Sequence, residues 1–204
     1  MSWITPCHRR EDFPAEFSTD DKITIFCEQT LGWQLDIADA CINGGLEVMR
    51  HSGYAVLLIV LSYFEMIAEM KGLSPFGGKG SQGKFNAGVL DVFRELSSSG
   101  PDVRDNVLKI LYVSGRCGLY HEGRVRGRII ISGDFQGPLV YEPHNRILGI
   151  NPHKLVPKLK AHLEEYILAL KGPDGTDLRK CFEQNFNRMS GTDPLVSTVP
   201  KTPP

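Results

Sequence analysis

The chain has 204 residues, of which 41% are hydrophobic and 23% are charged, and its formal net charge is −1. These values predict one soluble globular domain with additions, and they exclude a generally basic nucleic-acid-binding protein. Any nucleic-acid site must therefore be a local basic patch. The five cysteines include no CxxC pair, which favours reduced thiols in a cytoplasmic protein and disfavours a zinc site.

No targeting or membrane segment is predicted. Residues 7–12, with the sequence CHRRED, interrupt the N-terminus where a signal peptide needs an apolar core. The longest apolar run, residues 55–61, is too short to cross a bilayer. We therefore expect a cytoplasmic protein with no membrane partner.

The chain is expected to begin with an irregular arm and a long helix. Residues 1–19 are polar and contain two prolines, which favours a loose N-terminal arm, with Trp3 and Phe13 packing back onto the body. Apolar residues then recur every three to four positions over residues 23–50. This spacing predicts an amphipathic helix that the Gly44–Gly45 pair bends or interrupts.

A second long helix is predicted over residues 54–71, ending at Gly72. It is apolar nearly all round until Glu65, which indicates the central helix of a bundle. A buried carboxylate needs a partner, and an arginine from the fourth helix would suit Glu65. The alternative is that Glu65 faces solvent.

A glycine-rich loop is predicted over residues 73–84. Its segment GKGSQGKF satisfies GxGxxG and nearly satisfies the phosphate-loop pattern GxxxxGK[ST]. However, Phe85 replaces the required hydroxyl residue, and a helix precedes the segment where both patterns require a strand. We therefore predict a flexible basic loop, from which Lys79 and Lys84 contact a nucleic-acid backbone.

Two further helices are predicted after this loop. The first is short and amphipathic, over residues 85–96, and the second is the fourth helix, over residues 103–120, with Asp102 as its cap. The fourth helix ends in SGRCGLYH, which contains Arg116 and His121.

Arg116 and His121 are the candidate catalytic pair. Arginine is a permanent cation that grips a phosphate with paired donors, and histidine transfers protons at neutral pH. Together they could bind a phosphodiester and move a proton without a metal or another cofactor. Residues five apart lie about 140° apart on a regular helix, so convergence requires a distortion, which we expect at Gly118. The alternative is a surface arginine and an unrelated histidine at a helix end.

The sequence pattern changes from helix to strand after the motif. Arg124, Arg126 and Arg128 alternate with other residues, which predicts three cations on one face of a strand. Such a face would hold an RNA backbone without reading its sequence. The alternative is a solvated edge strand, where charges also prevent aggregation.

The remaining elements complete the predicted domain. Short strands over residues 139–141 and 147–150 predict a small antiparallel meander, from about residue 126 to 150. A long helix follows over residues 151–171, and a short one over residues 177–189. The organisation is an arm (1–19), a helical domain (20–174), and a short helix with a disordered tail (175–204).

The Arg116–His121 spacing, after a helical run in a mostly helical chain, resembles the Arg-x4–6-His motif of the HEPN superfamily (higher eukaryotes and prokaryotes nucleotide-binding). The resemblance implies a mainly α fold, a HEPN-like bundle of four to five helices. In this chain the β-meander is inserted before the last long helix. It implies a metal-independent endoribonuclease, of the kind found in toxin–antitoxin and host-defence systems. Arg116 and His121 would cleave RNA, with single-stranded RNA as the expected substrate, at the interface of a homodimer. Glu65, Cys117 and Tyr120 are the expected supporting residues of this site.

Two departures from the family pattern leave a second function open. Cys117 stands where a polar residue often follows the family's arginine. Gly123 stands where members paired with a nucleotidyltransferase antitoxin often have a tyrosine. The alternative is a non-catalytic HEPN module that binds RNA, a nucleotide or a partner protein such as an antitoxin. A purely structural dimerisation module is a third reading.

Overall fold

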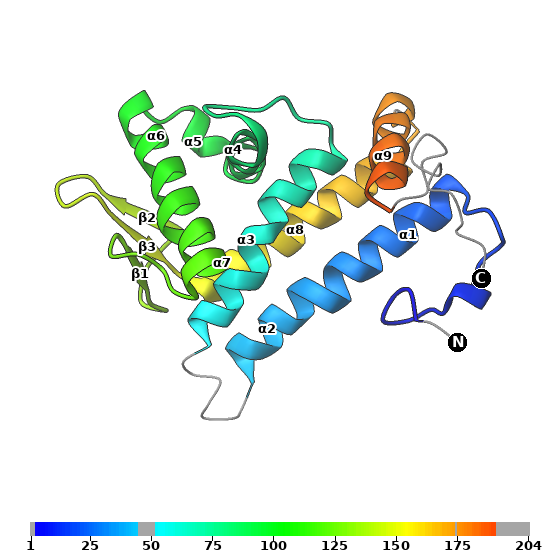
Figure 1. The fold of residues 1–204 in the computed structure, drawn as a ribbon, viewed down its shortest axis with the longest axis horizontal. Helices are drawn as coiled ribbons and strands as arrows, with labels where there is room; N and C mark the ends of the chain where they lie inside the picture. Colours follow the sequence, from blue (N-terminus) through cyan, green and yellow to red (C-terminus); the bar gives the residue numbers. More distant parts are fainter. Residues whose placement is uncertain (1–2, 45–51, 174, 191–204) are drawn as a thin grey trace, which may run out of the picture.

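The computed structural model describes residues 3–44, 52–173 and 175–190, which form a mainly helical bundle with one small sheet at an end (Figure 1). The helices are α1 (Thr19–Thr30), α2 (Asp36–Asn43), α3 (Gly53–Met70), α4 (Gly80–Val92), α5 (Arg94–Ser97), α6 (Pro101–Lys109), α7 (Gly118–Glu122), α8 (Pro152–Lys171) and α9 (Thr176–Met189). Two π-helical segments, Leu31–Leu35 and Ile110–Cys117, join α1 to α2 and α6 to α7.

The central helix α3 packs against α2, α4, α8, α9 and the second π-helix. Its crossing with α4 is close, because a Cβ atom at Gly88 would lie 1.8 Å from the carbonyl oxygen of Phe64. By length and mean hydropathy, 1.6, α3 also meets the requirement for a membrane span. The core helix of a soluble protein meets the same requirement, and half of α3 is buried inside the structure. The expectation of no membrane span was based on the apolar run of residues 55–61, and α3 is longer than that run.

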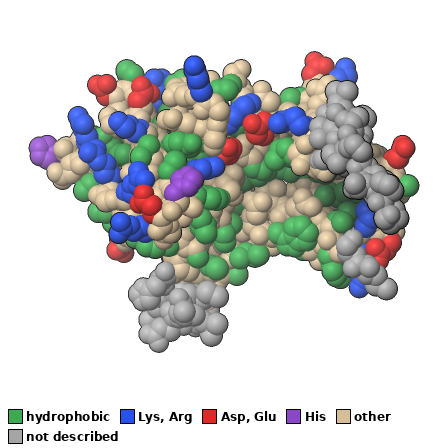
Figure 2. Space-filling view, viewed as in Figure 1, with side chains coloured by type: hydrophobic (Ala, Val, Ile, Leu, Met, Phe, Trp, Pro, Cys, Tyr) green, Lys and Arg blue, Asp and Glu red, His purple; other side chains and the backbone are tan. Residues whose placement is uncertain are grey.

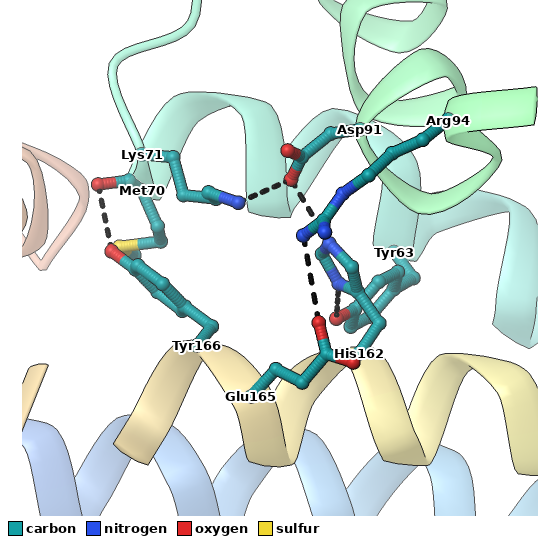
Figure 3. A network of polar contacts seen from close by, with 8 residues as sticks. All are labelled: Tyr63, Met70, Lys71, Asp91, Arg94, His162, Glu165 and Tyr166. Carbon is teal, nitrogen blue, oxygen red and sulfur yellow. Dashed lines mark hydrogen bonds and ion pairs between the residues drawn. The ribbon is translucent and has the colours of Figure 1, made fainter. Parts of the chain in front are cut away.

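A polar network in the core joins α3, α4 and α8 (Figure 3). The His162 ring lies between Tyr63 and Asp91, 2.8 Å from Nδ1 to Tyr63 Oη and 2.9 Å from Nε2 to Asp91 Oδ2. Lys71 Nζ donates to the same Asp91 oxygen at 2.5 Å. Burial alone would raise the pKa of Asp91, but hydrogen bonds and charge from His162 and Lys71 outweigh it and lower that pKa to about 2.

We expect Asp91→Asn to destabilise the fold by roughly 1–3 kcal/mol at neutral pH, because His162 and Lys71 lose their charged partner. A carboxyl whose pKa falls from 3.8 to about 2 on folding contributes stability above pH 3.8. That contribution is lost as the pH falls toward 2. Urea unfolding between pH 7 and pH 2 should therefore show the wild type and the variant converging in acid. Asp177→Asn, at an exposed position, is the control, and an equal loss at all pH values would contradict the assignment.

The sheet has the strand order β1-β3-β2, with β1 (Ile129–Ile131), β2 (Leu139–Glu142) and β3 (Ile147–Ile150). The two later strands form an antiparallel hairpin, as predicted. However, β1 pairs with β3 in parallel, so the sheet is mixed. The predicted antiparallel meander is wrong at this pairing.

The connection between β1 and β2 explains the mixed sheet, because it brings Phe135 over the central strand. The ring packs on Gly149, where a Cβ atom would lie only 2.6 Å from it. Asn151 Nδ2 fixes the connection by donating to the carbonyl oxygens of Gly133 and Phe135, at 2.8 and 2.7 Å. The central strand of the sheet is therefore β3, with β2 on one side of it and β1 on the other.

Several predicted boundaries differ from the structure. The helix predicted over residues 23–50 is divided into α1, a π-helical segment and α2, and residues 45–50 lie outside the described residues. The loop predicted up to Lys84 ends earlier, because α4 begins at Gly80. The cap of α6 is Gly100 with Pro101 in the first turn, rather than Asp102. These divisions give more helices than the four to five expected. A disordered tail was predicted over residues 190–204, and residues 191–204 lie outside the described residues.

The N-terminal arm is held against α1 rather than loose where the structure describes it. Thr5 is fully buried and donates to Glu28 Oε2 at 2.6 Å, and His8 Nδ1 lies 2.8 Å from the same oxygen. Phe13 packs against the core as expected, whereas Trp3 is exposed.

Candidate functional site

The motif lies where the helix leaves regular α geometry. Residues 110–117 form a π-helix, a form that often occurs at functional sites, and α7 continues from Gly118. The expected distortion is therefore present, but it lies before Gly118 rather than at it. Gly115 allows close packing, because a Cβ atom there would lie 3.2 Å from Leu61 and 3.3 Å from Ile129.

Arg116 extends from this π-helix to α3. Its Nη2 donates to Glu65 Oε2 at 3.2 Å, which confirms the predicted partner for that carboxylate. The two side chains are 23% and 31% exposed, so the pair is partly shielded but reachable from solvent. The guanidinium carbon also lies 5.0 Å from the centre of the Tyr120 ring and 5.9 Å from that of Tyr112. These contacts hold the cation in place.

A pocket of about 420 Å³ surrounds Arg116, and Tyr120 also lines it. Two carboxylates of α3, Glu65 and Glu69, form one wall, and Arg188 from the end of α9 contributes a second guanidinium. Arg188 Nη2 donates to Glu69 Oε2 at 2.7 Å. We call this the Arg116 pocket. Its side chains include two arginines, each already paired with a glutamate.

His121 lies on α7 and is exposed, but it does not line the Arg116 pocket. It follows Tyr120, whose ring contacts Arg116. The histidine is thus neither packed in the core nor joined with the arginine in one cleft. Cys117 is a half-buried free thiol at the end of the π-helix.

The basic segment after the motif is a turn and an irregular connection, so the predicted strand is wrong there. Gly123, with φ of +68°, ends α7, and the chain then folds back along the helix. The N–H groups of Arg124 and Arg126 donate to the carbonyl oxygens of Gly118 and Ser114, at 3.3 and 2.9 Å. Hydrogen bonds to the helix replace strand pairing, and β1 starts only at Ile129.

The three arginine side chains of this segment are exposed. Among them Arg126 is paired with Glu122, one turn earlier. That pairing raises the pKa of Arg126, through a hydrogen bond and the carboxylate charge. In Figure 2 basic side chains gather at the left of this face, where Figure 1 shows the sheet and α7. Arg124 and Arg128 flank Arg126 in the same connection, and both are exposed.

The two predicted lysines are placed differently from one another. Lys84 donates to the carbonyl oxygen of Leu73 at 2.9 Å and lies 3.9 Å from Glu69, which lines the Arg116 pocket. Lys79 is exposed before α4 and does not line that pocket.

Glu69 and Arg188 line this pocket, although neither was expected there from the sequence. Glu69 follows Glu65 by one helical turn, so its place on the same face of α3 was predictable. Nothing in the pattern of α9 indicates that Arg188 meets α3, because that contact depends on how two helices pack.

No family model, curated protein or solved structure matches this chain. The HEPN resemblance therefore remains a prediction from the motif, beside the geometry described above.

The Glu65–Arg116 pair should contribute about 1 kcal/mol or less to stability, because both groups are partly solvated. We expect a double-mutant cycle with Glu65→Gln and Arg116→Gln, followed by urea unfolding, to give a coupling energy of that size. The more exposed pair Glu95 and Lys158, 3.4 Å apart, should show a smaller coupling and is the matched control. A coupling energy at Glu65 and Arg116 no larger than that of the control pair would contradict the prediction.

Proposed function

We propose that this protein is a metal-independent ribonuclease of HEPN type, with Arg116 and His121 as its reactive groups. The observation that supports the proposal is the Arg116 pocket. A guanidinium is held there by one carboxylate and two tyrosine rings, and an exposed histidine follows five residues later. Arg124, Arg126 and Arg128 hold the RNA backbone beside it through charge alone.

The chemistry needs no metal. A base removes the proton of the ribose 2′-hydroxyl, whose oxygen attacks the phosphorus. The 5′-oxygen leaves and receives a proton, so the products are a 2′,3′-cyclic phosphate and a 5′-hydroxyl. His121 transfers these protons, and Arg116 stabilises the charge on the phosphate. The reaction needs both a base and an acid, and each chain supplies only one motif histidine. This favours a site formed by two chains.

An apolar patch beside the motif supports such a homodimer. Tyr54, Leu58 and Tyr120 are all exposed by more than 40%. Tyr120 Oη donates to the carbonyl oxygen of Leu58 at 3.4 Å, which places α7 against α3. A second copy covering this patch would bring its own His121 to the Arg116 pocket. Both motifs would then contribute to each site.

The pairing of Arg116 favours a second candidate, a non-catalytic module that binds RNA or a partner protein. Glu65 already accepts a hydrogen bond from the Arg116 guanidinium, and Glu69 adds a second negative charge to the same wall of the pocket. A phosphodiester must compete with these carboxylates. A binding module needs no such exchange, so cleavage is the test that separates the two functions.

His121→Ala should reduce cleavage of labelled single-stranded RNA in EDTA by about 100-fold or more, because proton transfer is lost. Arg116→Lys should also be severely impaired, since an ammonium group cannot reproduce the planar grip on a phosphate. His144→Ala, in the exposed turn between β2 and β3, is the matched control. If wild type does not cut RNA, or if His121→Ala cuts equally well, the ribonuclease proposal fails and the binding module remains.

Leu58→Glu should convert the homodimer to monomers, because a charge cannot be buried in an apolar interface without a partner. Light scattering reports the change, and RNA cleavage should fall with it. Leu168→Glu, at a still more exposed apolar position on α8, should leave both measurements unchanged. A monomeric wild-type chain that still cuts RNA would contradict the composite site.

A further inference from the structure

Three apolar side chains of the first π-helical segment and of α2 face solvent rather than the core. Trp33 is 45% exposed, Ile37 is 46% exposed, and Ala40 is also exposed. The opposite face of the same stretch, with Leu35 and Ala38, is fully buried. We call Trp33, Ile37 and Ala40 the Trp33 stripe. None of its residues lines the Arg116 pocket.

The spacing of the Trp33 stripe fits a second helix. Steps of four and then three residues separate its members, which is the spacing of the contact positions where two helices pack side by side. Gly44 follows after four more residues and adds no side chain that would hinder a partner. Tryptophan is among the residues enriched at the energetic centres of protein interfaces. The stripe therefore has the composition and the spacing of a helix-binding surface.

The N-terminal arm fixes the backbone at the start of the stripe. Pro6 packs on Gly32, where a Cβ atom would lie 2.4 Å from the proline ring. Gln29 Nε2 donates to the carbonyl oxygen of Ile4 at 2.7 Å, and Thr5 donates to Glu28. The residues before Trp33 are thus already ordered. A partner that binds here loses little free energy to ordering this surface.

The charge of this part of the molecule is negative. Residues 3–44 contain eight acidic residues and three basic ones, which gives a formal charge of −5 with histidine neutral. Asp36 and Asp39 adjoin the stripe, and their side chains are 57% and 38% exposed although both contact Lys160 of α8. This charge opposes a second copy of the same surface, an RNA and an anionic membrane. It favours a partner with basic side chains.

We propose that the Trp33 stripe binds an amphipathic helix of another protein, one with an apolar face and with lysine or arginine at its flanks. The apolar face covers Trp33 and Ile37, and the basic flanks lie beside Asp36 and Asp39. In Figure 1 the site lies along α2, on the other side of α3 from α4 and α6. Its binding does not depend on RNA cleavage.

Tryptophan fluorescence tests the proposal directly. The chain has two tryptophans, so Trp3→Phe leaves Trp33 as the single reporter. The probe is a synthetic peptide of about 20 residues, long enough to form a helix, with leucine at the contact positions and lysine at the flanks. Binding should shift the Trp33 emission to shorter wavelength, because the peptide removes water from the ring. A peptide with glutamate in place of lysine should bind about tenfold more weakly or worse.

Ile37→Lys, in the Trp3→Phe chain, should weaken binding of the lysine peptide by about tenfold or more, because it removes apolar area and adds a like charge. Ile130→Lys on β1, at a position 49% exposed, is the matched control and should bind as tightly as the Trp3→Phe chain. Both side chains are exposed, so both variants should fold. No emission shift at about 1 mM peptide, or equal binding by the two lysine variants, would overturn the proposal.

The same reporter distinguishes three other occupants of the stripe. If a chain that ends at Ser190 emits at longer wavelength, the chain's own residues 191–204 cover Trp33. If the emission changes with protein concentration, a second copy covers it. If vesicles of phosphatidylcholine and phosphatidylglycerol shift the emission, the stripe binds a membrane surface. Any of these three results overturns the proposal, and an unchanged emission in all three supports it.

Discussion

The burial of α3 determines where the charged groups of this protein lie. Other helices bury about half of it, and its crossing with α4 is so close that Gly88 cannot carry a side chain. The only long stripe of α3 left partly open contains Glu65 and Glu69, one turn apart. A half-buried carboxylate needs a counter-charge, and the arginines of two separate segments supply it. The Arg116 pocket is therefore a consequence of helix packing.

Elements with a strong hydrophobic period were predictable from the sequence. The bounds of α3, α8 and α9 agree with the expected ranges within one or two residues, and the arginine partner of Glu65 was expected from burial alone. Helix propensity and apolar spacing act over ten or more residues, so local exceptions do not obscure them.

The parts that were not predictable depend on contacts between distant residues. The alternation of Arg124, Arg126 and Arg128 has the period of a strand, yet their backbone is bonded to the carbonyl groups of the preceding helix. Strand order in the sheet depends on Phe135 packing over Gly149, which no local pattern reveals. The same holds for Arg188, whose partner lies 119 residues away in the chain. Tertiary contacts override a short-range period in each case.

The second π-helix, Ile110–Cys117, borders two pockets of the structure. Val113 lines a pocket together with Phe76 and Arg104, and Arg116, three residues later, lines the Arg116 pocket. Between them the Tyr112 ring contacts both Phe85 of α4 and the Arg116 guanidinium, at 5.4 and 5.9 Å. A π-helix holds its residues with longer-range hydrogen bonds than an α-helix and converts to it with a change of register. The contacts of Tyr112 therefore tie the position of the Arg116 guanidinium to the packing of α4.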